Sequence, residues 1–557
     1  MMGNWKNLIK RYDSKYSYKV IIKWLWKAWK GNRLQASLNA LIGLLGVALS
    51  LTQVWAVKHA VDVASRTIEG SVYWSVALMG VLVLFNFALG VASVWVKNIL
   101  GIKAQNRMQQ RMLDRILRSE WHGRETHHSG DVINRLEGDV SSIVTFLTET
   151  IPNTLATLAL FIGAFVYLFS MDKMLALVIV GMLPVFAVFS KVYMRQMRRL
   201  TRKVRDSGSK VQSILQETVQ NRMLIKTLES DDLMIGRLEG SQSELRHNVV
   251  RRTFFSVFSH IMLSFGFALG YLIAFLWSAL RMYEGTLSFG GMTAFLQLVN
   301  KIQGPARSLT KLVPSFVAVC TAAERLLELE EEPEEEQGEP VELAAPCGVR
   351  FNHVSYAYTP EDGEVISDLS FDFYPGSCTA VIGETGAGKT TLVRMVLALL
   401  HPQKGSIELY NNQESHELSP RMRCNLVYVP QGNTLMSGTI RENLLLGKPN
   451  ATEEEIHDAL MKSCADFVFD LPEGIDTVCD ESGGGLSEGQ AQRISIARAL
   501  LRNRSIMIFD EATSALDPET ERQLLNNILA SSDKTIIFIT HRPAVIEYCH
   551  QSLEIHR

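Results

Sequence analysis

The sequence predicts a two-part fold, in which a bundle of membrane-spanning helices precedes a mixed α/β domain. Two observations carry this prediction. Long segments without charged residues are confined to the first 300 residues, whereas short β-rich segments alternate with helical patterns after an acidic run at residues 328–339. The length of 557 residues is also enough for several domains of about 150 residues each.

Six apolar segments predict six transmembrane helices. A helix needs about 20 apolar residues to cross the hydrocarbon core of a bilayer, and five long segments of this kind in 280 residues are hard to bury without lipid. The last segment is shorter and continues into a part that carries Lys301 and Lys311. The segments are Leu34–Val57, Gly70–Val96, Thr150–Met171, Met174–Ser190, Thr253–Leu280 and Gly285–Asn300.

Two long basic connections set the expected orientation. Lys and Arg gather between the second and third segments and between the fourth and fifth, and the other connections carry few of them. By the positive-inside rule both long connections, and with them both chain termini, lie in the cytosol. Apolar residues at helical spacing in Met108–Leu117 and Val211–Leu228 predict helices that extend beyond the membrane. We expect their turns at Ser119–Gly130 and around Gln220–Arg222.

The first 30 residues are rich in Lys and Trp, among them Lys23, Trp24, Trp26 and Lys27. Aromatic rings with basic neighbours suit the lipid headgroup layer, so we expect an interfacial helix here. The alternative is a plain cytosolic leader with scattered Trp residues.

Charge and cysteine content exclude other classes of protein. Lys and Arg number 56 against 58 Asp and Glu, which gives a net charge of −2 and argues against a nucleic-acid partner. All seven Cys residues follow residue 319 and none forms a C-x-x-C pair. This pattern argues against a disulfide-stabilised secreted protein and fits a C-terminal half in a reducing compartment.

A phosphate-binding loop follows the predicted strand Cys378–Ile382. Its glycines let backbone N–H groups point at phosphate oxygens, and the next helix adds the positive end of its dipole. We expect Lys389 to bridge the β- and γ-phosphates of ATP and the Thr390 hydroxyl to bind Mg²⁺. The residues that match G-x-x-x-x-G-K-[ST], together with the residue that follows, are Gly383, Glu384, Thr385, Gly386, Ala387, Gly388, Lys389, Thr390 and Thr391.

Two carboxylates end a second predicted strand, Ser505–Phe509, about 120 residues downstream. One carboxylate at a strand end beside the phosphates can hold Mg²⁺ through water, and the next can polarise an attacking water as general base. We assign these roles to Asp510 and Glu511.

Further motifs in the same order and spacing resemble those of ABC ATPases. Leu486–Gln490 resembles the signature motif, Gln431 the Q-loop, Ser514–Asp517 the D-loop and His541 the switch histidine. Tyr358 stands where the family has an aromatic residue that stacks on adenine, and Tyr356 is the substitute candidate. Upstream, Ser129–Asp139 and Ala323–Arg325 resemble the membrane domain of ABC exporters. The resemblance covers nearly the whole chain.

The resemblance implies a half-transporter of the domain-swapped exporter class (type 1, also called type IV), with six membrane helices and a P-loop NTPase domain. It implies domains at residues 1–325 (transmembrane), 326–341 (acidic linker) and 342–557 (nucleotide-binding). Two chains form the working dimer, and their nucleotide domains enclose two ATP molecules. The two cytosolic turns become coupling helices, the second of which contacts the partner's nucleotide domain.

Residue roles follow from the same resemblance. Ser487 and Gly489 contact the γ-phosphate of the ATP held by the partner, and Gln490 and the D-loop Asp517 are further nucleotide-binding residues. Gln431 senses Mg²⁺, which Thr390 and Asp510 also bind. Glu511 is the general base, His541 holds the γ-phosphate and the attacking water, and Lys389 completes the catalytic set.

Two departures from the family pattern bear on function. Glu488 replaces the usual first glycine of the signature motif, and a carboxylate aimed at a γ-phosphate would repel it. Only sixteen residues follow His541, where the family has a further strand pair and helix, which leaves the C-terminal packing in question. His122, His127 and His128 cluster at the first turn, where a solvated loop is favoured over a metal site.

The predicted function is ATP-driven export of a lipid-like, drug-like or peptide substrate, with the chain placed in a bacterial inner membrane. The alternatives are one subunit of a heterodimer with unequal ATP sites and an ATP-gated channel or sensor with weak hydrolysis. Residues 489–493 are also reminiscent of thiol- or haem-related exporters. On the last apolar segment, Lys301 belongs to a polar stripe that either lines a central cavity and favours anionic groups or reaches the cytosolic headgroups.

Overall fold

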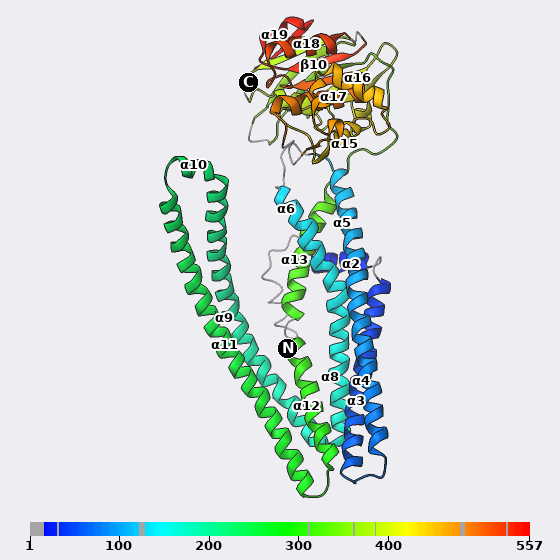
Figure 1. Ribbon diagram of the computed structural model, residues 1–557, viewed down its shortest axis with the longest axis vertical. Helices are drawn as coiled ribbons and strands as arrows, with labels where there is room; N and C mark the ends of the chain where they lie inside the picture. The colour runs from blue at the N-terminus through cyan, green and yellow to red at the C-terminus, as the bar shows by residue number, and fades with distance from the viewer. Residues whose placement is uncertain are drawn as a thin grey trace. The chain divides into compact units, whose positions relative to one another are not determined.

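The computed structural model describes residues 16–29, 33–121, 129–309, 312–359, 363–384, 386–479, 485–530 and 533–556. The chain divides into two compact units (Figure 1). Unit 1 consists of residues 1–113 and 133–328, and unit 2 of residues 114–132 and 329–557. His122, His127 and His128 lie outside the described residues.

The helices of the first 331 residues contain all six apolar segments. Four helical stretches are long and apolar enough to cross a membrane within the described part of the chain: Arg33–Ala64, Val72–Leu117, Gly130–Met171 and Asp231–Tyr283. The other two segments lie in α9 and α12. The helices are α2 (Tyr18–Trp29), α3 (Arg33–Ala64), α4 (Val72–Trp95), α5 (Gly101–Leu117), α6 (Ser129–Asn134), α7 (Val140–Thr145), α8 (Ile151–Met171), α9 (Lys173–Gln220), α10 (Arg222–Thr227), α11 (Asp231–Tyr283), α12 (Phe289–Leu309) and α13 (Leu312–Glu331), with π-helical segments η1 (Val96–Leu100), η2 (Arg135–Asp139) and η3 (Phe146–Thr150).

Helices α3, α8, α9, α11 and α12 share one core in unit 1. Leu168, Leu175, Leu298 and Ile302 are fully buried there. The corner between α8 and α9 is fixed by Asp172, whose carboxylate accepts hydrogen bonds from the backbone N–H of Leu175 at 2.9 Å and from the Trp277 indole at 3.0 Å. One carboxylate therefore caps α9 and holds α11 at the same point.

Helices α9 and α11 run side by side and meet at α10, which forms their tip (Figure 1). Lys210 on α9 and Glu244 on α11 form an ion pair at 3.2 Å. The turn expected around Gln220–Arg222 falls between α9 and α10, so the long basic connection is helical, as its apolar spacing predicts.

Unit 2 contains two main sheets. An antiparallel sheet has the strand order β2-β1-β4-β5, and a parallel sheet has the order β11-β3-β10-β9-β6. The strands are β1 (Gly348–Tyr356), β2 (Ile366–Phe373), β3 (Cys378–Gly383), β4 (Lys404–Tyr410), β5 (Ser415–Glu417), β6 (Leu426–Val429), β9 (Ile506–Asp510), β10 (Thr535–Ile539) and β11 (Gln551–Ile555), with a short pair β7 (Gly438–Thr439) and β8 (Val478–Cys479).

Helices connect the strands of unit 2. They are α14 (Lys389–Val396), α15 (Ile440–Leu445), α16 (Glu453–Lys462), α17 (Glu488–Arg502), α18 (Pro518–Leu529) and α19 (Pro543–Tyr548), with 3-10 turns η4 (Pro420–Asn425), η5 (Asp466–Asp470) and η6 (Gly474–Asp476). Strands β3, β9 and β10 are almost entirely buried, which explains their continuous apolar sequences.

The short C-terminal segment is well integrated. Strand β11 pairs in parallel with β3, from Gln551 opposite Thr379 to Ile555 opposite Gly383. The buried side chains of Leu553 and Ile555 join the core of the nucleotide domain. The sixteen residues after His541 thus supply one helix and one strand. The C-terminal segment packs through β11, which pairs with β3.

The acidic run begins as helix and then packs against the nucleotide domain. Residues 326–331 continue α13. After the helix ends, Glu335 forms a bidentate ion pair with Arg423, with two N–O distances of 2.7 Å, and Glu336 pairs with Arg421 at 3.3 Å. The negative charges therefore have specific basic partners in unit 2.

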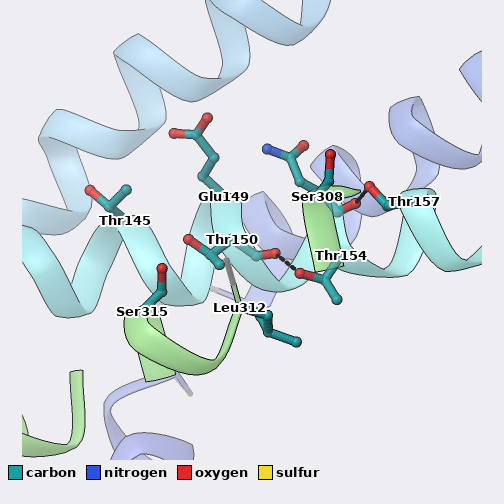
Figure 2. A pocket seen from close by; sticks show the side chains of 9 residues that line it. Thr145, Glu149, Thr150, Thr154, Thr157, Ser308, Leu312 and Ser315 are labelled. Atoms are coloured by element: carbon teal, nitrogen blue, oxygen red, sulfur yellow. Dashed lines mark hydrogen bonds between the residues drawn. The ribbon is translucent and has the colours of Figure 1, made fainter. Parts of the chain in front are cut away.

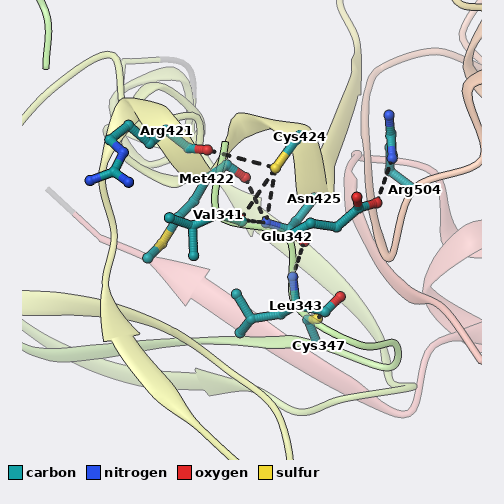
Figure 3. A network of polar contacts seen from close by, with 9 residues as sticks. All are labelled: Val341, Glu342, Leu343, Cys347, Arg421, Met422, Cys424, Asn425 and Arg504. Atoms are coloured by element: carbon teal, nitrogen blue, oxygen red, sulfur yellow. Dashed lines mark hydrogen bonds and ion pairs between the residues drawn. The ribbon is translucent and has the colours of Figure 1, made fainter. Parts of the chain in front are cut away.

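Asn425 holds the segment that follows the acidic run (Figure 3). Its amide group donates to the carbonyl oxygen of Val341 at 2.7 Å and accepts from the backbone N–H of Leu343 at 2.9 Å. The Cys424 thiol contacts the same Val341 oxygen at 3.2 Å, and Arg504 pairs with Glu342 at 2.8 Å. A buried side chain thus replaces a strand partner for this extended segment.

The first predicted turn, of which residues 119–121 and 129–130 are described, belongs to unit 2. The backbone N–H of Glu120 donates to Pro333 at 2.9 Å, and that of Glu335 donates to Arg118 at 2.9 Å. The Trp121 ring lies 4.4 Å below the guanidinium of Arg394, a residue of α14. The turn is therefore attached to the helix that starts at the phosphate-binding loop.

Candidate nucleotide-binding and hydrolysis site

The phosphate-binding loop joins β3 to α14. Gly383, Gly386 and Gly388 have φ values of 153°, 85° and 110°, which a residue with a Cβ atom rarely adopts. At Gly383 a Cβ would also lie 2.4 Å from the carbonyl oxygen of Ile555. The loop therefore follows the tight path that presents backbone N–H groups, while Thr385 lies outside the described residues.

Lys389 is the first residue of α14, and its ammonium group folds back over the loop. It donates to the carbonyl oxygens of Gly383 at 2.5 Å and Glu384 at 3.2 Å, and it lies 2.9 Å from Nε2 of His541. The switch histidine and the loop lysine thus meet at one place. Thr390 and Thr391 follow on α14, and Ala387 is buried beneath the loop.

Glu511 lies between Gln431 and His541. The Gln431 amide donates to Glu511 Oε2 at 2.7 Å, and His541 Nε2 lies 3.9 Å from Oε1. Glu511 has a φ of 46°, a strained value for a residue with a side chain, and its backbone N–H is held by Ile539 at 2.9 Å. Because β6, β9 and β10 are parallel, their carboxyl ends bring these side chains to one edge of the site.

Asp510, the other carboxylate of the pair, ends β9 and is partly buried. Its Oδ2 accepts a hydrogen bond from the Tyr428 hydroxyl at 3.0 Å. Burial raises the pKa of the Asp510 carboxyl and the nearby Glu511 charge adds to the rise, while the Tyr428 hydrogen bond and Lys389 oppose it. A cation at this carboxylate would relieve the cost of burying its charge.

The residues fit a nucleoside triphosphate with its divalent cation. No group of three or more His, Cys, Asp or Glu side chains suited to a metal occurs within the described ranges. Asp510 and the Thr390 hydroxyl offer two oxygen ligands beside the loop, and Mg²⁺ takes its remaining ligands from phosphates and water. The donor set therefore suits a cation that arrives with a nucleotide.

Tyr358 is the better placed of the two candidate stacking residues. Tyr356 is 8% exposed and belongs to the core, whereas Tyr358 is only partly buried. The Tyr358 hydroxyl lies 3.0 Å from the Thr391 hydroxyl and accepts from Arg394 at 3.0 Å. Arg394 and Trp121 are residues that motif reasoning missed, because an ordinary helical Arg and a lone Trp carry no sequence signal.

The signature motif starts α17. Ser487 caps this helix by accepting from the backbone N–H of Gln490 at 3.2 Å, and the Gln490 amide oxygen accepts from the Ser487 backbone at 2.9 Å. At Gly489 a Cβ would lie 2.8 Å from the carbonyl oxygen of Ala515 in the D-loop. Glu488 is exposed as the first helical residue.

Asp517 caps the start of α18. Its carboxylate accepts from the backbone N–H groups of Thr520 at 3.0 Å and Glu519 at 3.2 Å, which holds the pKa of Asp517 below its usual value. The hydrogen bonds described for Ser487, Gln490 and Asp517 thus lie at the starts of α17 and α18. They do not involve the phosphate-binding loop.

A helical membrane domain fused to a P-loop ATPase domain defines an ATP-driven membrane transporter. The family model of the ABC transporter transmembrane region matches residues 37–306, and the family model described as ABC transporter matches residues 366–514. The chain belongs to the ABC transporter family, as a half-transporter of the exporter class. It binds ATP and couples its hydrolysis to transport across the membrane.

Individual relatives agree with this assignment. An ATP-dependent lipid A-core flippase of Bordetella avium is 30% identical over 491 residues, which cover 85% of this chain and 81% of the relative. A putative multidrug export ATP-binding/permease protein of Staphylococcus aureus is 28% identical and covers 76% and 75%. A solved bacterial Atm1-family ABC exporter with ATP bound has the same fold, with a TM-score of 0.76, 23% identity and coverage of 94% and 93%.

Proposed function

We propose that two copies of this chain form a homodimeric pump that exports an amphipathic substrate, lipid-like, drug-like or peptide, from the cytosolic side of a bacterial inner membrane. Both termini and the ATPase domain face the cytoplasm. The names of the relatives support the lipid-like and drug-like parts of this range, because one is a lipid A-core flippase and another a putative multidrug export protein. The basic connections support the orientation.

The arrangement around Glu511 carries the proposal. The Glu511 carboxylate accepts a hydrogen bond from Gln431 and lies near His541. His541 in turn contacts Lys389, the residue that we expect to bind the phosphate oxygens. The base therefore lies close to the expected position of the γ-phosphate. Glu511 accepts a proton from the attacking water, and His541 and Lys389 stabilise charge on the γ-phosphate. Thr390, Asp510 and Gln431 would hold Mg²⁺, which would supply further charge stabilisation when bound.

The test is ATPase activity of the chain purified alone in lipid nanodiscs, beside Glu511→Gln. We expect activity in the wild type and a loss of about a hundredfold or more in the variant, because proton transfer to a positioned base contributes 10²–10⁴-fold. ATP binding should persist, and Glu547→Gln, which removes an exposed carboxylate of α19 outside the site, serves as the control. Equal rates for wild type and Glu511→Gln would contradict the assigned base.

One observation favours a second candidate, a heterodimer with unequal ATP sites. Glu488 places a negative charge at the helix start that, in a dimer, faces the partner's ATP. If the chain alone binds ATP but turns it over slowly, purification of its bound partner from native membrane will decide between a missing subunit and a gated channel.

A further inference from the structure

A polar cavity of about 370 Å³ lies within unit 1 (Figure 2). It is formed by η3 and α8 on one side and by α12 and α13 on the other. Apart from Leu312, every side chain that lines it carries a polar group. The lining residues are Thr145, Glu149, Thr150, Asn153, Thr154, Thr157, Ser308, Leu312 and Ser315.

The polar residues form one face of an otherwise apolar helix. Glu149, Asn153 and Thr157 follow one another at intervals of four, and Thr150 and Thr154 lie beside them, which places them on the same side. Polar side chains are expensive against lipid and in membrane proteins face a protein interior or a water-filled cavity. At the start of α8 this face lies near the cytosolic end of the span, given the proposed orientation.

Three of the six hydroxyl groups present acceptors to the cavity. Thr154 donates its proton to the carbonyl oxygen of Thr150 at 2.7 Å, and Thr157 donates to Asn153 at 2.7 Å. Ser308 donates to Gly304 at 3.3 Å. A hydroxyl has one proton and two lone pairs, so each of these oxygens retains the capacity to accept but has no second proton to give.

Glu149 adds a carboxylate to this set. Its Oε1 accepts from the Lys97 ammonium at 2.9 Å, and the carboxylate remains partly exposed. An ionised carboxylate offers about four lone-pair sites, of which this ion pair uses one. The cavity therefore combines several neutral acceptors with a carboxylate that has acceptor capacity left.

We infer that this cavity binds the primary-amine head group of an amphiphilic substrate. The inference rests on the proposed export function and specifies its substrate class. An ammonium group supplies three donors, which match the hydroxyl oxygens and the Glu149 carboxylate. The volume lies at the lower end of the 300–1,000 Å³ typical of ligand pockets, so it suits a head group whose tail stays in lipid.

Lys301 does not line this cavity. Its ammonium group donates to the Ser50 hydroxyl on α3. The preference for anionic groups that its sequence position suggested therefore has no support at this cavity, where Glu149 is the charged lining residue.

The test measures binding to the chain in nanodiscs without ATP, with empty nanodiscs as the baseline. The probes are dodecylammonium, dodecyltrimethylammonium and dodecyl phosphate. We expect dodecylammonium to bind about tenfold more tightly than the quaternary analogue, which has the charge without the donors. Glu149→Gln and the double variant Thr154→Val/Thr157→Val should each weaken dodecylammonium binding by about tenfold.

The control is Thr52→Val, since Thr52 on α3 makes the same kind of bond to a helix carbonyl, at 2.9 Å to Ala48, but lies outside the cavity. Equal binding of the two cationic probes, tighter binding of dodecyl phosphate, or unchanged binding in both cavity variants would overturn the inference. ATPase activity distinguishes failure of this inference from failure of the proposed pump. An active chain that does not bind dodecylammonium contradicts only the cavity assignment. An inactive chain that binds dodecylammonium contradicts only the pump.

Discussion

Glu488 is the residue at which this chain departs most clearly from the pattern of its family. It is exposed, and it follows the capping Ser487 at the start of α17, where a negative charge stabilises the helix by about 0.3–1 kcal/mol. In the proposed dimer the same helix start faces a γ-phosphate. Two unit negative charges about 8 Å apart repel by roughly 2 kcal/mol at an effective dielectric constant of ~20.

Glu488→Gly should therefore lower the KM for ATP by about three- to tenfold while it slightly lowers the melting temperature. Steady-state ATPase assays check the first effect and thermal unfolding the second. Glu488→Gln is the control that removes charge alone. If repulsion is the cause, the difference between wild type and variant shrinks in 0.5 M salt, and a difference that persists there would contradict the electrostatic reason.

Arg394 connects the first turn, at Trp121, to the candidate stacking residue Tyr358. Its guanidinium lies over Trp121 and donates to the Tyr358 hydroxyl. Arg394→Met removes both contacts, and we expect ATP to bind about five- to tenfold more weakly, because a hydrogen bond from a charged group contributes about 1.5–3 kcal/mol. Arg522→Met, on the exposed face of α18, is the matched control, and nucleotide titration of both variants measures the effect.

At the scale of single elements, Asn425 governs the segment that leads from α13 into β1. Its side chain is 2% exposed and satisfies the backbone of Val341 and Leu343. Asn425→Ala leaves the buried N–H of Leu343 without its partner, at a cost of about 1–3 kcal/mol, while the Val341 carbonyl oxygen keeps its contact with the Cys424 thiol. Thermal unfolding of the full chain should show a lower midpoint for the ATPase domain, and Asn412→Ala, at an exposed position between β4 and β5, should show little change.

The sequence predicts elements well where one physical signal dominates. The apolar segments became helices because hydrophobic length is sufficient to define a span. The phosphate-binding loop lies between a strand and a helix because its glycines can adopt the positive φ values that this path needs. The acidic run was interpreted as a linker because the sequence shows only how many charges lie close together in the chain. It does not show which distant residues these charges contact. Its partners, Arg421 and Arg423, lie about 90 residues away, and no periodicity indicates them.

The residues of the candidate sites also divide into those that a sequence motif predicts and those that no motif indicates. Lys389, Glu511 and His541 stand in motifs with fixed spacing, so the sequence alone assigns them, and the structure places them within hydrogen-bond or ion-pair reach of one another. The polar cavity was missed because its face spreads over η3 and α8, and a helix with scattered Thr residues looks like an ordinary span. The polar stripe that contains Lys301 contributes only Ser308, on α12, to the lining of the cavity.

At the scale of the whole molecule, the tip formed by α10 displays apolar side chains. Met223 is 82% and Leu224 56% exposed in the single chain. Exposed apolar clusters of this kind mark interaction surfaces, and in the proposed swapped dimer this tip contacts the partner's nucleotide domain. Met223→Glu should lower the ATPase rate at least tenfold without lowering the melting temperature of the chain.

Thr227→Glu adds the same charge at an exposed polar position of α10 and is the matched control. Size-exclusion chromatography of both variants in nanodiscs shows whether the dimer persists. An unchanged ATPase rate in Met223→Glu would show that the tip does not transmit contact between the subunits.

The pairing of β11 with β3 has a consequence for solubility. Without β11, the strand that carries the phosphate-binding loop would expose a row of unpaired N–H and C=O groups, and such an open strand edge is a template for association with a second unfolded chain. The five residues at 551–555 therefore protect the strand that carries the phosphate-binding loop from edge-to-edge aggregation. A chain that loses these residues through a translation error or proteolysis would keep its ATP-binding motifs but would aggregate with other copies of itself.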